Sequence, residues 1–189
     1  MNKTMSKKPK DRIVSTAAKL FSSHGIHTTG VDKVSAEADV SKRTLYKHFP
    51  SKEALVSAAV TEIGQAWFAA CTSSDANDPA ERIKHVFTMV EPMAEVEDFY
   101  GCIMMNTSIE LRGSDDLGVK VAREFKTKLY NYFEEQATLF NAKEPAVLAE
   151  QLVLLYDGIS AWIVMRRKFP ASAFQTLNLL LLHSNPLLK

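Results

Sequence analysis

Apolar residues recur every three to four positions along most of this chain, which is the spacing of one face of an α-helix. The first stripe begins near Asp11 and stops before Gly25, a residue type that commonly ends helices in the left-handed conformation. Alternating apolar and polar runs joined by hairpin turns, which would indicate β-strands, do not occur, and no segment repeats. The pattern predicts an all-α protein.

Two short helices are predicted next, separated by a sharp turn. Thr29 and Asp32 have the spacing of a capping box, in which two side chains bind backbone N–H groups at the start of a helix. Asp39 lies where the chain must turn, and Ser41 can cap a second short helix that ends near Phe49. We therefore expect two short helices that meet at Asp39.

A long helix is predicted after Pro50, because proline prevents easy continuation of the preceding helix. Ser51 can cap the new helix, and the carboxylate of Glu53 favours its positive N-terminus. Its apolar stripe consists of Ala54, Leu55, Ala58, Ala59, Ile63 and Trp67.

Turn residues divide the rest of the chain into further helices, which makes about nine in all. The apolar run 152–165 contains Asp157 and is shorter than the roughly 20 residues that span a bilayer, so we expect a buried helix and no membrane segment. The predicted ranges are 79–96, 102–112, 116–140, 145–168 and 171–184.

The composition indicates where such a protein works. Cys71 and Cys102 are the only cysteines, too few for a disulfide framework, so we expect a cytoplasmic protein. Residues 1–9 are charged and lack the apolar segment of a signal peptide, which predicts a flexible basic arm.

The charge is distributed unevenly along the chain. The net charge is +1, yet residues 1–52 hold 11 basic and 4 acidic residues, a net charge of +7, while the remainder holds 12 and 18, a net charge of −6. A basic N-terminal part suits a polyanion such as DNA, although a solvated basic face alone would give the same asymmetry.

The predicted helix over 42–49 separates its charges from its apolar residues. At about 100° per residue, Leu45 and Phe49 share one face. A short capped helix that is cationic outside and follows a tight turn is typical of a helix-turn-helix, whose second helix enters the DNA major groove. The opposite face carries Arg43, Thr44, Lys47 and His48.

Side-chain chemistry assigns roles within this surface. Lysines offer point charges to phosphates, whereas the planar fork of Arg43 can bind guanine with two hydrogen bonds. Lys42 and Lys52 could instead be solvated surface residues, and Tyr46 could be a half-buried core residue. The expected DNA contacts are Thr29, Lys42, Arg43, Thr44, Tyr46, Lys47, His48 and Lys52.

The stretch TTGVDKVSAEADVSKRTLYKHFPSKEAL resembles the N-terminal DNA-binding motif of TetR-type bacterial transcriptional regulators. The resemblance covers roughly residues 10–56 and includes AAKLFSSHG, LYKHF and SKEAL. Further on, GCIMMNTSIEL is similar to a Gly-Cys segment in the sensor domains of many members. In two places the sequence departs from the family: Asp39 stands where Gly is usual, and Arg43 stands where small residues are frequent.

The resemblance implies a helix-turn-helix DNA-binding domain over 10–52 and a helical ligand-binding and dimerisation domain over 53–189. It implies a homodimer that binds a palindromic double-stranded operator with the third helix of each subunit. It also implies a repressor that a small-molecule inducer releases from DNA. The same eight DNA contacts carry over from the family motif.

Two features of the C-terminal part bear on dimerisation and ligand binding. The segments QLVLLYDGISAWIVM and FQTLNLLLLH are more apolar than terminal helices of a monomer, so we expect a dimer through helices 145–168 and 171–184. Aromatic residues and methionines predict a pocket for a small apolar or aromatic inducer, although ordinary core packing is the commoner explanation of each single residue. These residues are Trp67, Phe68, Met89, Met93, Phe99, Tyr100, Met104, Met105, Phe125 and Trp162.

Three other functions have less support from the sequence. Cys102 follows Gly101 at a predicted helix start, where the dipole favours a reactive thiolate, so a redox-responsive regulator is an alternative. An enzyme is not expected, because the chain has no phosphate loop, nucleotide fingerprint, metal-binding motif or activated nucleophile, and we expect no cofactor. An architectural DNA binder would not need the long acidic helical body.

Overall fold

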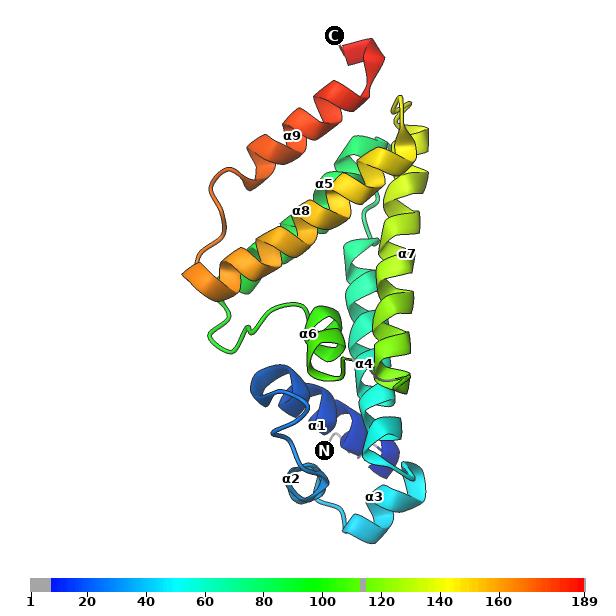
Figure 1. Ribbon diagram of the computed structural model, residues 1–189, viewed down its shortest axis with the longest axis vertical. Coiled ribbons are helices and arrows are strands. Elements are labelled where there is room, and N and C mark those ends of the chain that lie inside the picture. Colours follow the sequence, from blue (N-terminus) through cyan, green and yellow to red (C-terminus); the bar gives the residue numbers. More distant parts are fainter. Residues whose placement is uncertain (1–7, 113–114, 189) are drawn as a thin grey trace, which may run out of the picture. The chain divides into compact units, whose positions relative to one another are not determined.

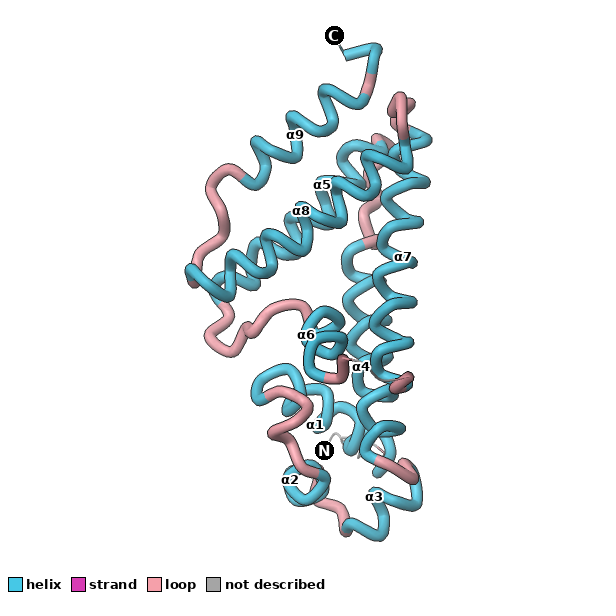
Figure 2. Tube along the Cα trace, in the orientation of Figure 1, coloured by secondary structure: helices cyan, strands magenta, loops and turns pink. Residues whose placement is uncertain are grey.

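The computed structural model describes residues 8–112 and 115–188, and over these ranges the regular structure consists of helices without a strand (Figures 1 and 2). The all-α prediction is confirmed. Residues 1–7 of the predicted basic arm lie outside the described residues, and Pro9 already belongs to the first helix. The α-helices are α1 (Pro9–His24), α2 (Val31–Glu37), α3 (Lys42–His48), α4 (Lys52–Cys71), α5 (Pro79–Val90), α6 (Ile103–Glu110), α7 (Leu117–Leu139), α8 (Pro145–Arg166) and α9 (Ala173–Ser184).

The prediction of one helix over 79–96 is wrong at its C-terminal end. The α-helix stops at Val90, and Glu91–Glu95 form a 3-10 helix. Pro92 has no backbone N–H to donate to the preceding turn, which accounts for the change of helix type. The other predicted ranges differ from the observed helices only by a few terminal residues.

The chain folds into two compact units. Of the described residues, the first unit comprises 8–65, 103–112 and 115–123, and the second comprises 66–102 and 124–188. Helices α4 and α7 each begin in the first unit and end in the second. Helix α6 belongs to the same unit as α1, α2 and α3, although 54 residues separate the end of α3 from the start of α6.

The first unit has its core among its N-terminal helices. Helix α1 packs against both α2 and α3. Ile13 and Ala17 of α1, Val34 of α2 and Leu45 of α3 are all fully buried there. Burial of the Ile, Val and Leu side chains stabilises each by about 1.5–3 kcal/mol relative to exposure, which holds helices of only seven residues in place.

The second unit is built mainly from α5, α8 and α9, which pack against one another, and from the part of α7 after Arg123 (Figure 1). Phe87 of α5 stacks on Phe133 of α7, with ring centroids 5.9 Å apart. The apolar run 152–165 led us to expect a buried helix, but helix α8 is buried on one side only. Leu152 is fully buried, whereas Leu154 is 66 % exposed and Met165 is 79 % exposed in the single chain.

Candidate nucleic-acid interface

The turn between α2 and α3 has the geometry that the sequence predicts. Asp39 adopts a left-handed conformation, with φ of 52°. Short polar side chains tolerate this region better than others do, so Asp39 can replace the glycine usual at this turn. The backbone N–H of Val40 then donates to the carbonyl of Ser35, 3.0 Å away, which closes the turn.

Arg12 of α1 braces the same turn. Its Nε donates to the carbonyl of Ala38 at 3.2 Å, and its Nη2 donates to the carbonyl of Asp39 at 2.9 Å. These carbonyls follow the last turn of α2, where backbone carbonyls have no partner within the helix, so the guanidinium helps to fix the angle between α2 and α3. Arg12 is a site residue that the sequence analysis missed, because it lies 27 positions from Asp39.

Thr29 does not have the predicted role. Helix α2 begins at Val31 with Gly30 as its N-cap, and no side chain caps it. Thr29 is 1 % exposed, and its hydroxyl donates to the carbonyl of Leu20 at 3.4 Å. The capping box is therefore wrong, and in this conformation the Thr29 side chain has no surface to offer a phosphate.

Helix α3 has the two faces that the sequence predicts. Ser41 caps it, because its Oγ accepts the backbone N–H of Thr44 at 3.0 Å. Leu45 is fully buried and Phe49 is 4 % exposed, so both anchor the helix to the core. The opposite face is therefore free to meet a ligand.

The predicted DNA contacts fall into two groups by exposure. Lys42, Arg43, Tyr46 and Lys47 are exposed, and Tyr46 at 46 % is a surface residue rather than part of the core. Thr44, His48 and Lys52 are half-buried. Apart from Thr29, the predicted contacts are thus accessible on α3 and on the first residue of α4.

The start of α4 is held by two side chains. Ser51 caps it as predicted, with its Oγ accepting the N–H of Ala54 at 3.1 Å. Glu53 lies in the first turn but also accepts the N–H of Leu117, the first residue of α7, at 3.0 Å. The Glu53 carboxylate therefore interacts with the positive N-termini of both α4 and α7, an arrangement that the sequence did not indicate.

This basic helix-turn-helix has counterparts among known proteins. The family model "Bacterial regulatory proteins, tetR family" matches residues 13–59. The crystal structure of a TetR transcriptional regulator from Streptomyces avermitilis (sav143) is 33 % identical, with a TM-score of 0.87, over 94 % of this chain and 98 % of that chain. The chain belongs to the TetR family.

Two curated relatives give the same assignment at lower identity. The HTH-type transcriptional repressor DhaR of Mycobacterium sp. (strain GP1) is 24 % identical over 185 residues, 88 % of either chain. The HTH-type transcriptional regulator YuxN of Bacillus subtilis is 28 % identical over 78 % of this chain, a match that spans only about half, 51 %, of that relative. The protein is thus a DNA-binding transcriptional regulator of the TetR family, which is not an enzyme class.

The ten residues predicted for an inducer pocket do not share one environment in this TetR-family regulator. Met104 and Met105 belong to the first unit, and the others belong to the second. Phe68 and Phe125 pack edge to face within the second unit, with centroids 6.4 Å apart. Trp162 is 46 % exposed on α8 under Arg166, so it lies at the surface of the single chain rather than in its interior.

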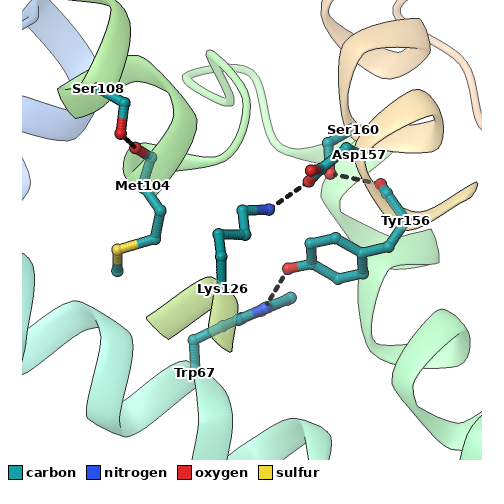
Figure 3. A network of polar contacts seen from close by, with 7 residues as sticks. All are labelled: Trp67, Met104, Ser108, Lys126, Tyr156, Asp157 and Ser160. Atoms are coloured by element: carbon teal, nitrogen blue, oxygen red, sulfur yellow. Dashed lines mark hydrogen bonds and ion pairs between the residues drawn. The ribbon is translucent and has the colours of Figure 1, made fainter. Parts of the chain in front are cut away.

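A polar network inside the second unit was not predicted (Figure 3). Trp67 of α4 donates its Nε1–H to the hydroxyl of Tyr156 on α8 at 2.6 Å. Lys126 of α7 pairs with Asp157 of α8, and its Nζ also lies 5.0 Å from the centre of the Tyr156 ring. The sequence showed one sign of it, because Asp157 is a charged residue in an apolar run.

The two cysteines lie in different environments. Burial, and then the neighbouring Cys102, raise the pKa of the Cys71 thiol to about 12, so Cys71 stays protonated. Burial raises the pKa of Tyr156 well above its ordinary value, and the two thiols add to the shift. Cys102 is half-buried directly before α6, as predicted, and its redox role stays a prediction.

Helices α8 and α9 carry an apolar surface in the single chain. They also border a groove of about 450 Å³ whose lining includes Val147, Gln151, Leu179 and His183. A surface of this kind is typical of a protein–protein interface. On α8 and α9, the most exposed large apolar side chains are Val147, Leu154, Trp162, Met165, Leu179 and Leu182.

Proposed function

We propose that this protein is a repressor that binds a palindromic operator as a homodimer and leaves it when a small apolar or aromatic inducer binds the second unit. The observation that carries the proposal is the outward face of α3. Arg43 and Lys47 are exposed on it, while Leu45 on the opposite side fixes the helix in the core.

The side chains of this face divide into contacts to the DNA backbone and contacts to bases. Lys42, Lys47 and Lys52 supply point charges for phosphates, and these contacts dominate affinity. Arg43 reads guanine in the major groove through its planar fork. Thr44, Tyr46 and His48 contribute hydrogen bonds to the DNA backbone, and Thr44 can also meet a thymine methyl group.

A second copy of the chain covers the apolar surface of α8 and α9 in this proposal. Exposure of Leu154 and Met165 to water is unfavourable, and a two-fold axis would bury both from each chain. Gly158 of α8 supports a close approach, because a Cβ atom at this position would meet nothing within 4 Å in the single chain. The dimer sets two α3 helices about 34 Å apart, the spacing of successive major grooves.

The inducer acts through α4 in this mechanism. Helix α4 starts at Lys52 beside α3 and ends at Cys71 in the second unit. Phe68 near its end packs on Phe125 and Tyr132, so a ligand that enters this aromatic cluster displaces α4. A change in the direction of α4 alters the spacing of the two α3 helices, and the ligand thereby shifts the population away from the DNA-binding form.

We assign the protein to the cytoplasm, where its DNA target is found. Helices α4 and α8 are long and apolar enough to cross a membrane, with mean hydropathies of 1.3 and 1.5. Core helices of soluble proteins pass the same test, and Lys126 of α7 pairs with Asp157 within α8. These helices are therefore parts of a folded protein core in this proposal.

Selection of bound sequences from random duplexes tests the proposal. We expect an enriched palindrome with half-sites one helical turn apart, and an affinity that falls on the order of 10³-fold from about 50 to 200 mM salt. The double variant Lys42→Ala/Lys47→Ala should enrich nothing under the same conditions. A wild-type protein that enriches no sequence, or that binds an isolated half-site as tightly as the palindrome, would overturn the proposal.

A further inference from the structure

Glu110, the last residue of α6, is bonded to the loop between α1 and α2. Its carboxylate oxygen Oε2 accepts the backbone N–H of Ile26 at 2.8 Å and that of His27 at 2.9 Å. The ring Nε2 of His27 lies 2.6 Å from the main-chain carbonyl oxygen of Glu110. Three polar contacts thus join residues that are more than 80 positions apart in the sequence.

The carboxylate fills a site formed by the loop backbone. Two successive N–H groups that converge on one oxygen form an anion-binding concavity. The Ile26 side chain is 1 % exposed, so its N–H is held at the edge of the core, where an unpaired donor is unfavourable. Among the described residues, Glu110 is the acceptor that the structure gives for both N–H groups.

Gly25 makes room for this carboxylate. Its φ is +84°, a conformation that L side chains rarely adopt. A Cβ atom there would also lie 3.2 Å from Oε1 and 3.3 Å from Oε2 of Glu110. Glycine at this position therefore ends α1 and also lets the α6 carboxylate reach the loop.

The loop leads directly to the DNA-binding face. It enters α2 at Val31, and the seven residues of α2 lead to the turn that Arg12 braces. The Thr28 and Thr29 hydroxyls donate to carbonyls of α1. The backbone N–H groups of Ile26 and His27 donate to Glu110 of α6. Helices α1 and α6 thus both hold the segment that leads into α2 and α3.

We propose that Glu110 is a positioning residue for operator recognition. Its carboxylate holds the loop, and with it α2 and α3, in the orientation that fits the major groove. The inference rests on the proposed function for the operator, but the contact itself can be tested without DNA.

Amide hydrogen exchange tests the contact in the full-length protein. Glu110→Ala should speed exchange at Ile26 and His27 by at least about tenfold, because both lose a charged acceptor. The exchange rates in Glu110→Gln should lie between those of the wild type and those of Glu110→Ala, since the neutral carbonyl of Gln can accept the same hydrogen bonds. The control Glu62→Gln removes a carboxylate from an exposed position of α4 and should change nothing at the loop. Unchanged exchange in Glu110→Ala would overturn the proposal.

The ratio of operator affinity to random-duplex affinity separates positioning from simple destabilisation. Glu110→Ala should lower operator affinity about tenfold and random-duplex affinity less than about twofold, because non-specific binding depends on charge rather than on orientation. An unchanged ratio, or an equal loss on both duplexes, would contradict a positioning role. If the wild type selects no operator, the proposed function fails, whereas the exchange experiment still decides whether Glu110 holds the loop.

Discussion

Lys42 of α3 and Asp32 of α2 form an ion pair, with 2.7 Å between Nζ and Oδ1. Their side chains are 60 % and 69 % exposed, so water screens the pair and it adds little to stability. The pair does place a carboxylate beside a lysine that we assign to phosphate. If Lys42 contacts phosphate as proposed, Asp32 competes with DNA for it.

Replacement of Asp32 should strengthen DNA binding. Asp32→Asn should raise affinity for duplexes of any sequence about two- to fivefold at low salt, because it removes a repulsive charge and frees Lys42. Fluorescence anisotropy with labelled duplexes measures this, and the melting temperature should stay unchanged. In a Lys42→Ala background the gain should shrink. A gain of the same size in both backgrounds would show that Asp32 acts on DNA without involving Lys42.

Arg43 and Lys47 lie on the same exposed face but should respond differently to substitution. Arg43→Ala should cost about 1–3 kcal/mol on the operator and relax the preference at one base pair of each half-site. Lys47→Ala should weaken binding to all sequences alike and lower the salt dependence, since it removes a phosphate contact. Affinities for the operator and for its single-base variants measure both. Equal effects of the two substitutions would mean that these roles are wrong.

Asp39 can be tested through its left-handed conformation. Asp39→Gly should change the free energy of unfolding by less than about 1 kcal/mol, because relief of strain and added chain freedom offset each other. Asp39→Val should destabilise by about 1–2 kcal/mol or more, since a β-branched residue is an outlier at positive φ. Urea unfolding measures both, and Glu37→Val in the helical conformation of α2 should cost less than Asp39→Val. The reverse order would contradict the assigned role of the turn.

Local signals explain what the sequence predicted well. Ser41, Leu45 and Phe49 lie within nine residues, and a cap and a helical face depend only on such short spacings. Thr29 shows the limit of the same reasoning. Its spacing to Asp32 fits a capping box, yet the carbonyl of Leu20, nine residues earlier, binds its hydroxyl instead. A tertiary contact therefore determines where the Thr29 side chain lies.

Contacts between distant residues could not be predicted in this way. Arg12 lies 27 positions from Asp39, and Glu110 lies 84 positions from Ile26. Neither partner has a residue type that is unusual in its local context, so the fold must be known before the contact is visible. The two compact units do not follow the order of the chain for the same reason. Helix α6 belongs with α1–α3 because of contacts between residues that are distant in the sequence.

The apolar surface of α8 should decide the oligomeric state. Leu154→Glu should yield a monomer, because a charge at a buried position of the interface is strongly unfavourable. Light scattering after size exclusion measures the mass, and operator binding should fall with it. The matched control Leu139→Glu changes a side chain that is 53 % exposed at the end of α7, and it should remain dimeric. A dimeric Leu154→Glu variant would place the interface elsewhere.

The thiols should differ in reactivity because of the pKa of Cys71. That pKa is raised from 9.0 to about 12, so at pH 8 the Cys71 thiolate is scarce, and its amount rises about tenfold per pH unit until about pH 12. At pH 8, a thiol reagent should label one cysteine per native chain, Cys102, and label Cys71 only after unfolding. Cys102→Ser should abolish the native labelling. If oxidant changes the operator affinity of Cys102→Ser as much as that of the wild type, Cys102 is not a redox sensor.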